Sequence, residues 1–136
     1  MEELMKAVKL SEGYKPTVYK DTLQIDTIGY GFAIKDLYLD EEVCDIILEQ
    51  KLKKLIKSAD KKFEFLKYMP QEGKDVVYEM CYQLGINGVS KFKKTLAYMQ
   101  DKKYDKAAVE MLDSLWAKQT PNRAIKLSNI IKSLGW

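Results

Sequence analysis

The chain contains no histidine, and this absence restricts its possible chemistry more than any other feature of its composition. Histidine-based catalytic triads, histidine zinc sites and imidazole acid–base catalysis are all excluded. A catalytic site in this sequence must use carboxylates, cysteine, lysine or tyrosine. Two carboxylates in different environments, one protonated and one ionised, are the natural alternative at neutral pH, and glycosidic bond cleavage is the leading reaction of that type.

Glu12 and Asp21 are the carboxylates whose local sequence favours these two states. Glu12 is expected at the carboxyl end of a helix, where the dipole disfavours negative charge, so it suits the proton donor. Asp21 is expected to stay ionised in a polar hairpin turn. Each also has an ordinary explanation, Glu12 as a surface carboxylate and Asp21 as a turn residue that binds its own backbone. Spacing alone favours these ordinary explanations, because any charged chain contains such pairs.

Two expected elements would position these carboxylates. Apolar residues share one face of a first helix, namely Leu4, Ala7 and Val8, and Gly13 is placed to end that helix in a left-handed conformation. β-Forming residues flank polar turn residues between Thr17 and Phe32, which indicates a small antiparallel hairpin.

Amphipathic helices are expected over the rest of the chain. A long helix should follow Asp40, a good N-cap, and run to about Lys62. Its lysine-rich face is interpreted as solvated, with anion binding as the less favoured alternative. Pro70 should open another helix that Gly85 closes. Three further helices are predicted, at Val89 to Met99, Asp105 to Trp116, and Thr120 to Leu134, the last with Thr120 as N-cap and Pro121 in its first turn.

Length and composition indicate one soluble globular domain. The chain has 136 residues, of which 46% are hydrophobic and 32% charged, and its net charge of +3 favours anionic polymers without requiring nucleic acid. No transmembrane run is present, and the acidic amino terminus does not resemble a classical signal peptide. Cys44 and Cys81 stand alone in helical segments, so we expect buried free thiols and no metal site, with a single disulfide as an open alternative.

Three segments occur in a specific order and spacing: SEG at 11–13, VYKDT at 18–22 and TIGYG at 27–31. This combination resembles the phage-type lysozymes, the endolysin muramidases of glycoside hydrolase family 24. In that family a glutamate, an aspartate nine residues later and a threonine six residues beyond it form the catalytic triad. The corresponding residues here are Glu12, Asp21 and Thr27.

The resemblance extends through the helical half of the chain. The run MCYQLG at 80–85 looks like the family's glutamine-containing helix, and QTPNRA at 119–124 is similar to its carboxyl-terminal stretch. The match spans nearly the whole chain and is weakest in the middle.

The resemblance assigns a role to each matching residue. Glu12 would protonate the leaving glycosidic oxygen, while Asp21 and Thr27 would activate water on the opposite sugar face, which inverts the anomeric configuration. Arg123 matches the arginine that pairs with the catalytic glutamate, and Gln83 looks like a cleft residue that binds substrate. Their ordinary alternatives are a surface arginine and a helix-edge glutamine.

The sequence also departs from the family pattern. Phe32 stands where the family usually has histidine, and the interval from Phe32 to Asp40 is much shorter, which removes most of the second part of the small β lobe. Asp26 lies next to Thr27, and strand alternation should point it to the opposite face. Trp116 is interpreted as a core residue rather than a sugar platform.

We therefore predict an α+β, mainly helical, lysozyme-like fold in a single domain, residues 1–136. A small β lobe should cover about 14–39, a long connecting helix about 40–62, and a helical lobe about 70–136 together with the amino-terminal helix. As the resemblance implies, the protein would hydrolyse β-1,4 bonds between N-acetylmuramic acid and N-acetylglucosamine in bacterial peptidoglycan, without a cofactor or metal.

The expected partner is the peptidoglycan glycan strand, bound by a monomer with no stable membrane insertion and no nucleic-acid partner. The resemblance further implies accumulation in a host cytoplasm and release through a membrane lesion made by another protein. Two alternatives stay open. Phe32 and the shortened lobe motivate a catalytically weak or inactive peptidoglycan-binding domain on the same fold, and the lysine-rich helix motivates a nucleic-acid-binding domain.

Overall fold

The computed structural model describes residues 1–135 and is mainly helical with one small antiparallel sheet, so it confirms the α+β fold class. The chain forms two compact units, the first covering Met1–Asp45 and the second beginning at Ile46. In the described residues, no helix is long and apolar enough to cross a membrane.

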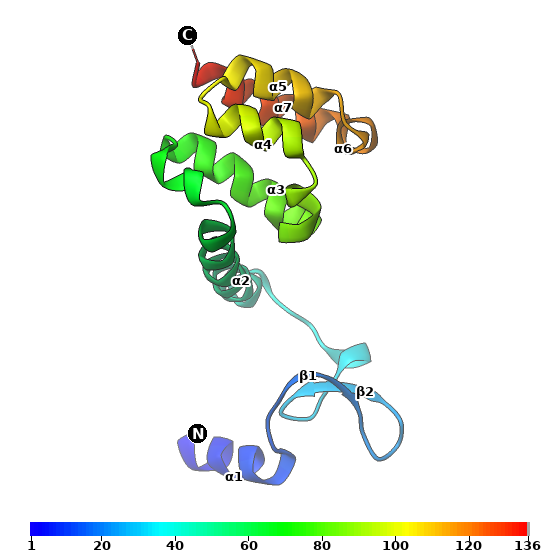
Figure 1. Ribbon diagram of the computed structural model, residues 1–136. Helices are drawn as coiled ribbons and strands as arrows, with labels where there is room; N and C mark the ends of the chain where they lie inside the picture. The colour runs from blue at the N-terminus through cyan, green and yellow to red at the C-terminus, as the bar shows by residue number, and fades with distance from the viewer. Residues whose placement is uncertain (136) are drawn as a thin grey trace. The chain divides into compact units, whose positions relative to one another are not determined.

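Unit 1 carries a helix followed by a three-stranded sheet of order β1-β2-β3 (Figure 1). Its elements are α1 (Glu2–Glu12), β1 (Lys15–Lys20), β2 (Asp26–Gly29), β3 (Phe32–Ala33) and a 3-10 helix, η1 (Ile34–Asp36). The first helix ends before Gly13 as expected and Gly13 has a positive φ of 72°, but its ψ of 159° lies outside the left-handed helical conformation that was expected. The hairpin formed by β1 and β2 was expected, whereas β3 was missed because it has only two residues and follows a glycine-containing turn.

The long helix α2 (Glu41–Lys62) begins where the sequence predicts. The Val43 amide donates to Asp40 Oδ1 at 3.0 Å, which confirms Asp40 as the N-cap. The boundary between the two units falls within this helix, after Asp45. Cys44 is exposed in its first two turns, so the expectation that it would be buried is wrong.

Unit 2 contains the rest of α2, a 3-10 helix and five further helices. These are η2 (Glu64–Tyr68), α3 (Gln71–Ser90), α4 (Lys93–Gln100), α5 (Tyr104–Leu112), α6 (Leu115–Gln119) and α7 (Pro121–Ser133). Gly85 does interrupt the helical geometry, with φ 79° and ψ 160°, but helix resumes after this kink and α3 continues to Ser90. The next helix accordingly begins at Lys93 rather than Val89.

The helix expected at 105–116 is instead two helices, α5 and α6. Ser114 separates them, because its Oγ accepts the Ala117 amide at 3.1 Å and caps a new helix. Pro121 opens α7 as expected, but the Thr120 hydroxyl does not cap it and donates to the Trp116 carbonyl at 3.0 Å instead.

The core of unit 2 lies where α5 packs against α4 and against α7. Figure 1 shows these three helices next to one another. Its fully buried side chains include several methionines and branched aliphatic residues, among them Val77, Met99, Met111, Leu127 and Ile131. Trp116, 4% exposed, belongs to this core as predicted. Cys81 is buried as predicted, and burial raises the pKa of its thiol to about 11, which keeps it protonated and unreactive at neutral pH.

Candidate active site

Glu12 is the last residue of α1, so it lies at the carboxyl end of a helix as predicted. The side chain is exposed, and its carboxylate lies directly over the turn between β2 and β3. A Cβ atom built on Gly31 would lie 2.7 Å from Glu12 Cδ and would overlap Oε2. The end of α1 and this turn therefore meet at the Glu12 carboxylate.

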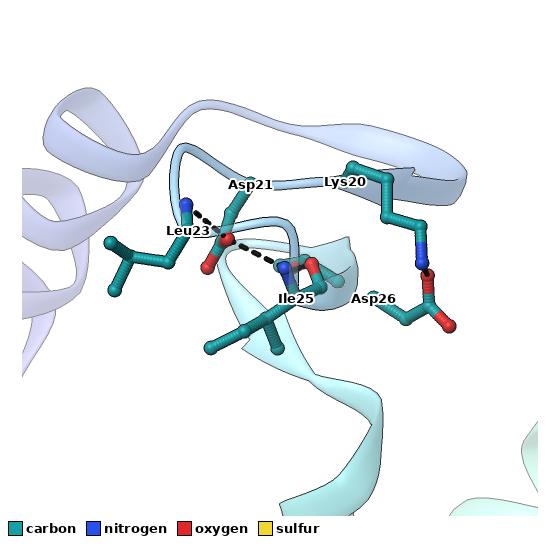
Figure 2. A network of polar contacts seen from close by, with 6 residues as sticks. Lys20, Asp21, Leu23, Ile25 and Asp26 are labelled. Atoms are coloured by element: carbon teal, nitrogen blue, oxygen red, sulfur yellow. Dashed lines mark hydrogen bonds and ion pairs between the residues drawn. The ribbon is translucent and has the colours of Figure 1, made fainter.

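Asp21 closes the turn between β1 and β2, and Figure 2 shows its carboxylate held by backbone amides. The amides of Leu23 and Ile25 donate to Asp21 Oδ1 at 2.8 and 2.9 Å. This is the turn contact that the ordinary explanation of Asp21 anticipated. Both amides use the same oxygen, and among residues 1–135 no hydrogen bond to Oδ2 is found. The turn thus fixes the direction of the carboxylate and leaves one oxygen available to a water molecule.

Thr27 lies on β2, the central strand, opposite Tyr19 on β1 and Ala33 on β3. It is only 3% exposed, and its hydroxyl donates to the Ile25 carbonyl at 2.8 Å. Because its proton is used in this bond, Thr27 Oγ1 can offer only its lone pairs to a water molecule.

Ile25 connects the two residues through its backbone, a role that the sequence did not reveal. Its amide donates to the Asp21 carboxylate, and its carbonyl accepts from both the Asp21 amide, at 3.0 Å, and the Thr27 hydroxyl. Since only backbone atoms of Ile25 take part, its side-chain type carries no signal of this role. The arrangement holds an acceptor carboxylate and an acceptor hydroxyl on one rigid turn.

Asp26 points away from this arrangement, as strand alternation predicts. It is exposed beside the buried Thr27, and its Oδ1 lies 2.7 Å from Lys20 Nζ on the paired strand. Figure 2 shows this ion pair separate from the Asp21 carboxylate. Asp26 is therefore partnered by a cation, and Asp21 is the carboxylate held by the turn.

Phe32 stands at the edge of an aromatic cluster in unit 1. The Phe32 ring packs edge-on against the Tyr30 ring, with 6.3 Å between the ring centroids. The Tyr30 ring also contacts the Tyr14 ring, with 5.5 Å between their centroids. The Lys9 ammonium lies 5.4 Å from the centre of the Tyr30 ring. Phe32 therefore takes part in aromatic packing where the expected histidine would supply a polar group.

Arg123 and Gln83 lie in unit 2, and each has a partner that the sequence did not reveal. Arg123 Nε in α7 donates to Glu79 Oε2 in α3 at 2.7 Å. The Trp116 indole N–H donates to Gln83 Oε1 at 2.9 Å, which fixes the orientation of that amide. The partners are 44 and 33 positions apart in the sequence, so no local pattern could have identified them. The pairing of Arg123 with Glu12 and the contact of Gln83 with substrate stay predictions.

The pocket on the Trp116 side of unit 2 has a volume of about 500 Å³. Aromatic and aliphatic side chains line it together with charged ones, including Phe92, Leu115, Lys91 and Asp113. None of the five predicted site residues lines this pocket.

The geometry of unit 1 provides the parts of a two-carboxylate site. It brings Glu12, Asp21 and Thr27 into the same compact unit, the first over a glycine turn and the other two on a shared backbone network. A solvent-accessible carboxylic acid can donate a proton, and a fixed carboxylate with a free oxygen can accept one from water.

Comparison with known proteins identifies relatives over most of the chain. The family model for phage lysozyme matches residues 9–129. Two curated relatives from Dictyostelium discoideum are similar over nearly their whole length. The chain is 28% identical to "Probable T4-type lysozyme 1", with 93% of this chain and 91% of the relative aligned, and 27% identical to "Probable T4-type lysozyme 2", with 98% and 95% aligned.

Proposed function

Since this chain belongs to the phage lysozyme family, we propose that it is a muramidase that cleaves the β-1,4 bond between N-acetylmuramic acid and N-acetylglucosamine in bacterial peptidoglycan. Family membership makes it a lysozyme-type glycosidase, and the proposal adds the bond and the mechanism. The observation that carries it is the turn that fixes the Asp21 carboxylate and connects it to Thr27, in the same unit as the exposed Glu12.

In the proposed reaction Glu12 is the general acid. It transfers its proton to the glycosidic oxygen as the bond from that oxygen to the anomeric carbon breaks. Asp21 takes one proton from a water molecule, whose oxygen attacks the anomeric carbon from the opposite face of the sugar. Thr27 Oγ1 accepts a hydrogen bond from the other proton of that water, because its own proton is held by Ile25. Solvent exchange then returns a proton to Glu12 and removes one from Asp21.

The test is an analysis of the products released from purified peptidoglycan. We expect new reducing ends on N-acetylmuramic acid, seen as muramitol after borohydride reduction, and the α-anomer as the first product in a time-resolved NMR experiment. Reducing ends on N-acetylglucosamine, or new amines without new reducing ends, would each overturn the proposed bond specificity. A 1,6-anhydro product would show cleavage of the same bond without water and would overturn hydrolysis. The β-anomer as first product would overturn the inverting mechanism.

The neighbouring aspartates Asp21 and Asp26 offer a matched control for this test. Asp21→Asn should remove hydrolysis, because the amide cannot take the proton from water. Asp26→Asn should keep it, because Asp26 is turned away from Thr27 and pairs with Lys20. Equal activity of the two variants would contradict the role given to Asp21.

A catalytically weak peptidoglycan-binding domain is the second candidate, and Phe32 is the observation that favours it. Its aromatic packing replaces the polar group expected at this position. This candidate predicts that the folded protein sediments with peptidoglycan and releases no reducing ends.

For the cellular role, we propose release from the cytoplasm to the cell wall through a membrane lesion made by another protein. The support for this role is the resemblance to endolysins alone. Expression in a bacterium with and without a pore-forming lysis protein tests it, and lysis should require both proteins.

A further inference from the structure

We propose that Gly31 is a positioning residue for catalysis, because the absence of a side chain there leaves the space that the Glu12 carboxylate occupies. The inference rests on the proposed function, in which Glu12 is the general acid. Gly31 has no functional group, so its effect on catalysis would come only from the space it leaves for Glu12.

The geometry around Gly31 sets it apart from the other turn glycines of unit 1. A Cβ atom on Gly31 would come within 2.7 Å of Glu12 Cδ and 3.3 Å of Glu12 Cγ, besides overlapping Oε2. Real Cβ atoms essentially never approach another heavy atom more closely than 3.0 Å. The same construction on Gly13 meets nothing within 4 Å, and on Gly29 it meets the ring of Phe32. Gly31 is thus the glycine of unit 1 at which a side chain would occupy the space of the Glu12 carboxylate.

Within unit 1, the space at Gly31 is the feature of the structure that bears on where the Glu12 side chain lies. The residue is exposed at the end of α1, and within unit 1, whose residues the structure describes completely, no hydrogen bond or ion pair to its carboxylate is found. A glutamate side chain with free rotamers would spread over many positions. The bare Gly31 Cα leaves the room in which the carboxylate lies against the turn that follows β2.

Gly31→Ala should therefore displace the acid. The φ of +74° strains any larger residue, and the new methyl group forces the end of the flexible Glu12 side chain to move. A displacement of about 1 Å in a catalytic group can cost on the order of 10²-fold in rate. We expect kcat to fall at least about tenfold, with KM changing much less, because Gly31 acts on the acid rather than on substrate binding.

Gly29→Ala is the matched control. Gly29 ends β2 two residues before Gly31 and has a similar φ of +70°, so alanine there causes comparable backbone strain. Its Cβ would lie 2.8 Å from two ring carbons of Phe32, not near Glu12. The kcat of this variant should stay close to wild type. The basic limb of the pH profile of kcat, which reports ionisation of the acid, should move in Gly31→Ala and not in Gly29→Ala.

A stability cycle tests the same contact without any activity measurement. Gly31→Ala should cost more stability to urea in the wild-type background than in a Glu12→Ala background, where the space is free, by a small margin because only the far end of the flexible Glu12 side chain must move. The Gly29→Ala cost should be the same in both backgrounds. An equal Gly31→Ala cost in both backgrounds would overturn the proposed contact.

The outcomes separate this inference from the proposed function. If Glu12→Gln abolishes hydrolysis while Gly31→Ala keeps the wild-type kcat and pH profile, Gly31 is not a positioning residue and the proposed function stands. If the folded wild-type protein releases no reducing ends, the proposed function fails, and with it the catalytic part of this inference. The stability cycle would then report on the contact alone.

Discussion

At the scale of single residues, the geometry of the candidate site depends on the backbone amide and carbonyl of Ile25, whose side chain has no catalytic group. The Ile25 amide and carbonyl hold Asp21 and Thr27 in a common frame, and on this arrangement we base the proposal that the two side chains act on one water molecule. The sequence identified both residues by type and spacing. It could not identify Ile25, because a peptide bond looks the same at every position.

Thr27→Val tests the hydroxyl within this frame. Valine has nearly the same shape and keeps the β-branched side chain of the strand, so the fold should remain while the acceptor for water is lost. We expect kcat/KM to fall at least about tenfold, equivalent to about 1.4 kcal/mol of transition-state stabilisation. Thr27→Ser, which retains the hydroxyl, should lose less. Steady-state hydrolysis of soluble peptidoglycan fragments measures both variants, and wild-type activity in Thr27→Val would show that the hydroxyl is not needed.

At the scale of elements, helices could be predicted from periodicity, but their interruptions and cross-links could not. The pattern over 105–116 is apolar enough for one helix, yet the Ser114 hydroxyl caps a new one. Likewise α2 and α3 are joined by a hydrogen bond of 2.5 Å from the Tyr78 hydroxyl to Asp60 Oδ1. Burial, with Asp60 as a further cause, raises the pKa of Tyr78 well above its usual range, so the hydroxyl stays a donor. These partners are 18 residues apart, which no local pattern reveals.

Tyr78→Phe measures what this cross-link contributes. The hydroxyl is buried but Asp60 is exposed, so water can replace part of the lost bond. We expect the free energy of unfolding in urea to fall by about 1 kcal/mol. The control is Tyr82→Phe on the same helix, where the structure gives the exposed hydroxyl no partner among residues 1–135, and its effect should stay within about 0.5 kcal/mol. Equal effects of the two changes would show that the cross-link contributes no stability.

At the scale of the whole molecule, the parts predicted best are those encoded over short distances. Glu12, Asp21 and Thr27 lie within sixteen consecutive positions. All three fall inside residues 9–129, which the phage lysozyme family model matches. The contacts of Arg123 with Glu79 and of Gln83 with Trp116 needed the folded chain, because helices far apart in sequence bring those side chains together. The exposed Cys44 was missed for a related reason, since apolar character alone does not say which turns of a helix are covered.

The role of Glu12 as the catalytic acid is tested by comparing the release of reducing sugar from purified peptidoglycan by wild type and by Glu12→Gln. Glutamine has almost the same shape as glutamate but cannot donate the proton, and Glu3→Gln on the same helix is the control. With circular dichroism showing all three proteins folded, we expect Glu12→Gln to lose at least about 10²-fold in rate and Glu3→Gln to match wild type. A Glu12→Gln variant that hydrolyses peptidoglycan at the wild-type rate would show that Glu12 is not the catalytic acid.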